Sequence, residues 1–215
     1  MLWVRASSSQ SYIHATRPKS TLCQELAVCA DLEGKKVAIL DHDEQGSITQ
    51  WGKDRDKETP VIIPVKGKPL SEFIALAHEK KYDFVFIDAA GKDSPSSYEA
   101  MEQADLCLVP LRARKKDIYP ARVNIEASMK LGKDLIFVLN HCPPRLRHDL
   151  AEKANSLGSY GTLCPIRIGN RVTFQDADDE GQSAIENNPT DKAALEIQEL
   201  WKWVKQFIRK TNPTL

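Results

Sequence analysis

The amino-acid sequence predicts a single α/β domain, built on an open, mostly parallel twisted sheet with helices on both faces. Short apolar runs alternate with segments of helical periodicity, a rhythm typical of right-handed β-α-β crossovers. The run Phe84–Ile87 is almost wholly apolar, as expected for a strand covered on both faces. The chain has 215 residues, the size of one such domain, and no linker rich in Gly or Ser divides it.

Composition excludes several classes of protein. The 30 basic and 30 acidic side chains cancel, so overall charge indicates neither a nucleic-acid nor a membrane partner. No apolar run approaches the roughly 20 residues that span a bilayer, and the N-terminus lacks a signal-peptide pattern, so we expect a cytoplasmic protein. The cysteines form no C-x-x-C pair, which argues against a zinc site or a disulfide framework. They are Cys23, Cys29, Cys107, Cys142 and Cys164.

Up to residue 65 we expect one helix and two strands. Apolar residues at helical spacing predict a helix that begins at Lys19 and buries one face. The short apolar runs 37–40 and 61–65 predict strands, the second at a sheet edge because of its prolines. The polar segment 46–60 between them predicts a loop, with Trp51 packed beneath it.

The middle of the chain repeats this alternation. A helix at 69–80 presents four apolar side chains inward, and the strand at 84–87 follows it. A short helix at 99–104 then precedes a strand at 105–110 that ends at a proline.

The last third of the chain adds two more strands and three helices. Helices are expected at 120–131 and 147–157, and strands at 135–140 and 162–166. The segment 191–210 is strongly amphipathic and predicts a terminal helix packed on the sheet.

Carboxylates follow two of the predicted strands directly. Asp41 and Asp43 end the first strand with i, i+2 spacing, and Asp88 ends the strand at 84–87. The carboxyl ends of parallel strands meet at one edge of an open sheet, where carboxylates can hold a phosphate-bound metal ion. Together with Lys19-Ser20-Thr21 upstream, they suggest a nucleotide hydrolase.

Five motifs follow one another in fixed order: K-S-T, V-A-I-L-D-H-D-E-Q-G-S, F-V-F-I-D-A-A-G, A-D-L-C-L-V-P and L-I-F-V-L-N. They carry a family resemblance that covers roughly residues 14–208. The chain resembles the ParA/MinD family of deviant Walker ATPases, most closely its small plasmid-partition members. The resemblance implies a P-loop NTPase-like fold, ATP and Mg²⁺ as cofactors, and a homodimer in the ATP-bound state. It further implies non-specific DNA and a centromere-binding ParB-like protein as partners, without a membrane.

The resemblance assigns catalytic and phosphate-binding roles residue by residue. It implies that Lys19 binds the β- and γ-phosphates and neutralises charge during catalysis. Ser20 matches the hydroxyl that binds Mg²⁺, and Thr21 supports it. Asp43 matches the residue that positions the attacking water.

The remaining predicted site residues end strands. By the resemblance, Asp88 holds the metal through a water, Asp41 lies on the metal side, and Asn140 lies near the adenine. A simpler interpretation is that each of them caps the turn after its strand. His42 is interpreted as a bystander that faces the sheet.

The phosphate-binding loop departs from the family pattern K-G-G-x-G-K-[ST]-T. Ala15, Thr16 and Pro18 replace its three glycines, and Pro18 also lacks the N–H that should face a phosphate. His14 stands where the family has a lysine that reaches across the dimer. A serine-rich run of low strand propensity replaces the apolar first strand.

Two explanations of this departure stay open. Either the chain is a pseudo-ATPase with weakened or lost phosphate binding, or residues 1–18 come from an incorrect start or reading frame. We therefore treat 1–18 as an atypical N-terminal segment and 19–215 as the ParA-like domain.

The densest basic cluster is a candidate DNA contact, since phosphate contacts alone permit binding without sequence preference. The alternative is a solvated charged face. A rival function is a nucleotide-independent module that binds DNA or a partner protein, and a less favoured one is a ligase of the dethiobiotin-synthetase type. The cluster consists of Arg112, Arg114, Lys115 and Lys116.

Overall fold

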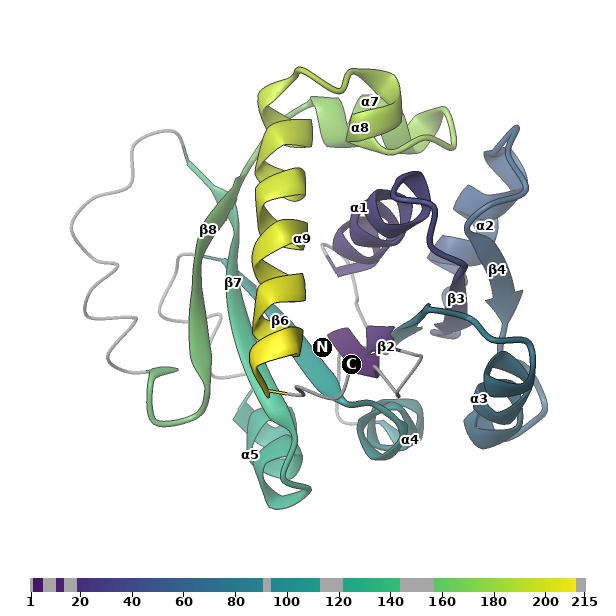
Figure 1. Cartoon of the computed structure of the whole chain (residues 1–215), viewed down its shortest axis with the longest axis vertical. Helices are drawn as coiled ribbons and strands as arrows, with labels where there is room; N and C mark the ends of the chain where they lie inside the picture. The colour runs from purple at the N-terminus through teal and green to yellow at the C-terminus, as the bar shows by residue number, and fades with distance from the viewer. Residues whose placement is uncertain are drawn as a thin grey trace.

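The protein is an α/β domain with helices on both faces of one sheet (Figure 1). The computed structural model describes residues 2–5, 11–13, 19–90, 94–112, 122–143 and 157–211. The strands are β1 (Leu2–Arg5), β2 (Ser11–Ile13), β3 (Val37–His42), β4 (Val61–Pro64), β5 (Phe84–Ala89), β6 (Leu106–Arg112), β7 (Asp134–Cys142) and β8 (Thr162–Gly169). Within these described ranges the order is β4-β3-β5-β1-β6-β7-β8, and β2 pairs with β5 outside this path.

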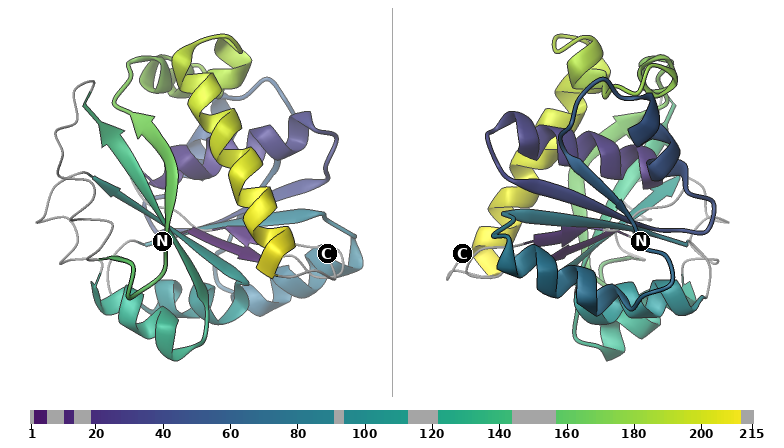
Figure 2. Two further views of the ribbon diagram at one scale, coloured as in Figure 1. Left: turned by 60° about the vertical axis from the view of Figure 1, so that its left-hand side comes forward. Right: turned by 90° about the vertical axis from the view of Figure 1, so that its right-hand side faces the viewer.

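Helices form the two outer layers (Figure 2). They are α1 (Lys19–Leu32), α2 (Ser47–Asp54), α3 (Leu70–Glu79), α4 (Pro95–Gln103), α5 (Arg122–Lys130), α7 (Thr173–Asp179), α8 (Ala184–Asn187) and α9 (Lys192–Thr211). α1 and α9 cover one face of the sheet, and α3, α4 and α5 cover the other (Figures 1 and 2). No helix among the described residues is both long and apolar enough to cross a membrane.

Successive side chains of a strand point alternately into two hydrophobic cores, one on each face of the sheet. On β3, Val37 and Ile39 pack toward α1 and α9, whereas Ala38 and Leu40 pack toward α3 and α4. This follows from the two-residue period of a strand, and explains why nearly every strand residue is apolar. The aromatic ring of Trp201 on α9 contacts Phe84 edge-on at 5.0 Å between centroids. The predicted packing of the terminal helix on the sheet is confirmed.

The first helix is buried more completely than predicted. One buried face was expected, but all residues of α1 from Leu22 to Ala30 are buried, including Gln24 and Glu25. The reason is tertiary, since α1 is in contact with α8 and α9 as well as with β3 and β5. A helix enclosed in this way needs internal partners for its polar side chains.

The N-terminal segment contributes strands where none was expected. β1 pairs antiparallel with both β5 and β6, and β2 pairs parallel with β5. β1 lies between β5 and β6, whose facing edges carry backbone N–H and C=O groups that need partners. Backbone pairing places few demands on side chains, so propensity was a poor guide here. The pairs formed by β3 to β8 with one another are parallel, as predicted.

Other differences from the sequence prediction are local. The predicted loop at 46–60 contains helix α2, because Ile48 and Trp51 lie one turn apart and are buried. Trp51 packs inward as expected, and β4 is an edge strand as its prolines indicated. The short helices α7 and α8 were not predicted. The predicted helix at 147–157 lies almost entirely outside the described residues.

Candidate functional site

The carboxylates of the two central strand ends lie together. In the parallel pairing of β3 with β5, Asp41 stands opposite Asp88. Both side chains are buried, with exposed fractions of 3% and 0%. Asp43 follows β3 at the same edge of the sheet and is partly exposed. The structure therefore brings together the three carboxylates singled out by the sequence.

The first turn of α1 points at this edge. Ser20 Oγ donates a hydrogen bond of 2.8 Å to Asp88 Oδ2. The other oxygen, Asp88 Oδ1, is buried and has no hydrogen-bond partner among the residues that the structure describes. A buried carboxylate oxygen without a donor is unfavourable unless a cation or a water satisfies it. Ser20 and Asp88 thus form an incomplete polar site at the N-terminus of a helix.

The electrostatics of this edge are dominated by negative charge. Burial raises the pKa of Asp88 well above its usual value. The hydrogen bond from Ser20 lowers this pKa, whereas the negative charges of Asp41 and Asp43 raise it further. Burial lowers the pKa of Lys19, whereas the charges of Asp88 and Asp43 favour its protonated form. A cation placed here would favour the ionised form of Asp88. Ser20 and Asp88 therefore offer oxygen ligands to a divalent metal ion, although no group of three His, Cys, Asp or Glu side chains among the described residues is arranged to hold one.

Asp41 has a different set of contacts. Its Oδ2 accepts hydrogen bonds from Thr49 N at 2.8 Å and Thr49 Oγ1 at 2.5 Å, near the start of α2. Its Oδ1 accepts a longer one, of 3.4 Å, from Asp43 N. Through Oδ1 Asp41 bonds the turn after its strand, which is the structural alternative left open by the sequence, and through Oδ2 it satisfies a free N–H in the first turn of α2. Its place on the metal side stays a prediction.

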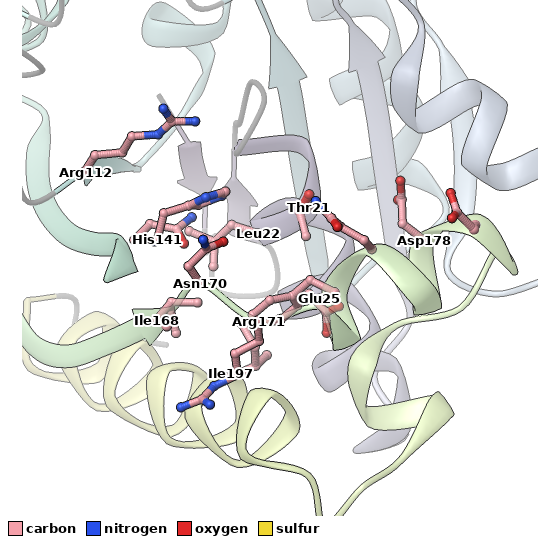
Figure 3. A pocket seen from close by; sticks show the side chains of 15 residues that line it. Thr21, Leu22, Glu25, Arg112, His141, Ile168, Asn170, Arg171, Asp178 and Ile197 are labelled. Carbon is pink, nitrogen blue, oxygen red and sulfur yellow. Dashed lines mark hydrogen bonds between the residues drawn. The ribbon is translucent and has the colours of Figure 1, made fainter. Parts of the chain in front are cut away.

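A pocket of about 500 Å³ adjoins the start of α1 (Figure 3). It lies between α1, α7 and the carboxyl ends of β6, β7 and β8. The basic side chains Arg112 and His141 lie on one side of it, and the acidic Asp178 on the other. Thr21 and Asn140, both predicted site residues, line it as well.

Asn140 and His141 line the pocket at the end of β7. Asn140 Oδ1 accepts a hydrogen bond of 2.7 Å from the backbone N–H of His141, whose φ is 52°. Asn tolerates such turns because its short side chain bonds to nearby backbone. Burial and, secondly, the charge of Arg112 lower the pKa of His141. The imidazole is therefore neutral at pH 7.

The predicted DNA contact is only partly described. Arg112 is exposed at the end of β6 and lines the pocket, so it lies beside the site and not on a distant outer surface. Arg114, Lys115 and Lys116 lie outside the described residues.

Polar contacts that tie α1 to the late helices were missed by sequence reasoning. Both carboxylate oxygens of Glu25 accept from the backbone N–H of Ala184, at 2.9 and 3.1 Å. Gln24 Nε2 donates to Asp178 Oδ1 at 3.0 Å. Polar residues on a helix usually face water, and nothing in the spacing marks these as buried. Glu25 also lines the pocket, which links the site to α8.

Comparison with known proteins connects this geometry to one group of solved structures. No protein-family profile and no curated protein sequence matches the chain. The cell division ATPase MinD of Pyrococcus furiosus superposes with a TM-score of 0.72 at 18% identity, covering 87% of this chain and 93% of that one. MinD of Pyrococcus horikoshii, complexed with Mg-ADP, gives 0.71 at 16% identity, covering 91% and 93%.

A plasmid partition protein shows the same likeness. The protein from Borrelia burgdorferi, bound to AMPPNP, gives a TM-score of 0.67 at 17% identity, covering 92% of this chain and 97% of that one. At these identities the likeness shows the fold alone. The structural neighbours are MinD/ParA-family ATPases, as the sequence motifs predicted, and the P-loop NTPase-like fold is confirmed.

Proposed function

We propose that this chain is a ParA-like Mg-ATPase of the partition type, acting at the carboxyl ends of β3 and β5. The observation that carries the proposal is the contact between Ser20 and Asp88, with Asp88 Oδ1 left without a partner in the described part of the chain. A hydroxyl at the start of a helix beside a strand-end carboxylate is the donor set that a phosphate-bound Mg²⁺ requires.

Each residue of the edge has a role in this proposal. Lys19 binds the phosphates; burial lowers the pKa of its amine, and the charges of Asp88 and Asp43 act in the opposite direction. Ser20 and Asp88 would hold Mg²⁺, which neutralises charge on the phosphates. Asp43 is partly exposed at the same edge and orients the attacking water. Asp41 supports Asp43 by fixing the turn that carries it.

The adjoining pocket is proposed to take the nucleoside. Its volume of about 500 Å³ falls in the range of small-molecule sites, and polar side chains make up most of its lining. A neutral His141 and the amide of Asn140 suit a purine base better than a charged group.

Partners follow from the same proposal. ATP binding would support a homodimer in the cytoplasm, with Arg112, Arg114, Lys115 and Lys116 contacting DNA phosphates. A centromere-binding ParB-like protein would stimulate hydrolysis.

The loop residues favour a second candidate, a pseudo-ATPase interaction module that binds DNA or a partner protein without hydrolysis. In the sequence, the three glycines that would face the phosphates are replaced by Ala15, Thr16 and Pro18. Each replacement adds a side chain, and Pro18 also lacks the backbone N–H. Nucleotide binding discriminates between the two candidates.

Calorimetric titration with Mg-ADP and Mg-ATP tests the proposal. We expect micromolar binding by the wild-type protein, weakened about 10- to 100-fold in Lys19→Ala, because a charged hydrogen bond is worth about 1.5–3 kcal/mol. Lys53→Ala, at an exposed site on α2, is the matched control and should bind as the wild type does. Absence of binding at millimolar nucleotide would leave the interaction module as the function.

A further inference from the structure

His42 lies between the two aspartates of the first strand end and has a partner on another element. Its Nε2 is 3.0 Å from Oε2 of Glu99 on α4, within hydrogen-bond distance. The side chains are 14% and 31% exposed. His42 was interpreted from sequence as a bystander facing the sheet, and the structure instead joins it to a helix.

Glu99 also holds a second element. Its Oε1 accepts a hydrogen bond of 2.5 Å from the backbone N–H of Leu70, the first residue of α3. This N–H is one of the donors that a helix leaves without an internal partner. Glu99 therefore has both oxygens engaged, one by β3 and one by α3, which restricts its side chain to one orientation.

The helix that carries Glu99 is itself attached to the other carboxylate-bearing strand. Ser97 Oγ donates to the carbonyl oxygen of Ala90, two residues after Asp88. Ser94 caps the same helix, accepting from Ser97 N at 3.2 Å. α4 is thus bonded both to the chain just after Asp88 and, through Glu99, to the residue just before Asp43.

The turn that carries Asp43 begins where the ladder between β3 and β5 ends. The last ladder pairs are Asp41 with Asp88 and His42 with Ala89. Beyond them the turn is closed by short-range bonds: Asp43 N to Asp41 Oδ1 at 3.4 Å, Gln45 N to Asp43 Oδ1 at 3.0 Å and Gly46 N to Asp43 O at 3.0 Å. The pair formed by His42 and Glu99 adds a side-chain link, through α4, at the point where the ladder stops.

We propose that the His42–Glu99 pair is a positioning pair that sets Asp43 relative to Asp88 for the hydrolytic step. The inference rests on the proposed ATPase function and deepens it. Neither side chain lines the pocket described above, so the pair acts on the orientation of Asp43 and not on binding of the nucleotide. Displacing a reacting group by about 1 Å can slow a reaction about 100-fold, so even a modest tilt of the turn matters.

The test separates turnover from binding. His42→Leu removes the ring nitrogens, whereas His42→Gln retains an N–H that can reach Glu99. We expect kcat for Mg-ATP hydrolysis to fall about tenfold in His42→Leu and to recover within about threefold of wild type in His42→Gln, since positioning losses are graded. Affinity for Mg-ADP, measured by calorimetry, should stay within about twofold in both variants.

Lys68→Leu provides the matched control, because it breaks an exposed ion pair with Glu72 on neighbouring α3 without touching the strand end. Thermal unfolding of each variant confirms that it is folded. A kcat for His42→Leu equal to that of wild type would overturn the positioning role alone, as would a folded His42→Gln that recovers nothing. Absence of Mg-ADP binding or of turnover in the wild-type protein would instead overturn the proposed ATPase, and this inference with it.

Discussion

Replacing Arg55 by methionine is expected to lower the free energy of unfolding by about 3–5 kcal/mol, because it removes the buried partner of the Glu186 carboxylate and leaves it only the exposed Lys57 and a backbone N–H. Arg55 and Glu186 have side chains only 2% and 4% exposed. Both guanidinium nitrogens reach Glu186 at 2.9 Å, and they also donate to the carbonyl oxygens of Gly181 and Thr59. The pair joins the C-terminal end of α2 to the short helix α8, which packs against α1.

Urea unfolding measures this effect, with Lys57→Met as the matched control. Lys57 contacts the same carboxylate at 2.9 Å but is 57% exposed, so its loss should change stability by at most about 1 kcal/mol. The double variant Arg55→Met/Glu186→Leu should recover part of the lost free energy of unfolding, since it also removes the buried negative charge of Glu186. A single Arg55→Met variant within about 1 kcal/mol of wild type would contradict the prediction.

The stability of the wild-type protein should fall as pH rises from about 4.5 to about 8, and Glu25→Gln should remove part of this slope. Burial raises the pKa of Glu25 from 4.5 to about 8, opposed by the Ala184 N–H and reinforced by Glu186 and Asp178. Between these values the folded protein holds a proton that the unfolded chain has released. The folded state binds more protons, so raising the pH favours unfolding, by up to about 1.4 kcal/mol per pH unit.

Unfolding measured from pH 5 to pH 8.5 checks this prediction. Other buried groups such as Asp88 also titrate, so the informative quantity is the difference in slope between wild type and Glu25→Gln. Glu79→Gln, at an exposed position on α3, serves as the control and should leave the slope unchanged. Equal slopes for wild type and Glu25→Gln would show that the carboxyl of Glu25 ionises as it does in the unfolded chain.

Local pattern was sufficient for most of the fold. The apolar runs at 37–40, 84–87 and 135–140 became three parallel strands, and the amphipathic segment 191–210 became α9. Strand and helix periodicity arise within a few residues, so a short window carries them. Helix α2 was missed because its segment is polar overall, although Ile48 and Trp51 lie at helical spacing.

The candidate site divides in the same way. Asp41 and Asp88 could be placed together from sequence, because two aspartates that end neighbouring parallel strands lie at the same edge of the sheet. The hydrogen bond that Asp41 accepts from the first turn of α2 depends on where that helix starts, which the predicted loop concealed. The link from His42 to Glu99 spans 57 positions, far beyond any periodic pattern.

What the amino-acid sequence specified is the alternation of strands and helices, and with it the edge at which Lys19, Asp43 and Asp88 gather. Packing of distant segments settled which polar side chains are buried and what they bond. Glu25 meets Ala184 across 159 positions, and Arg55 meets Glu186 across 131. Those partners depend on the packing of α8 and α9 against α1, which the spacing of residues within one helix does not predict. The place of β1 between β5 and β6 was settled likewise, by unpaired backbone groups and not by side-chain propensity.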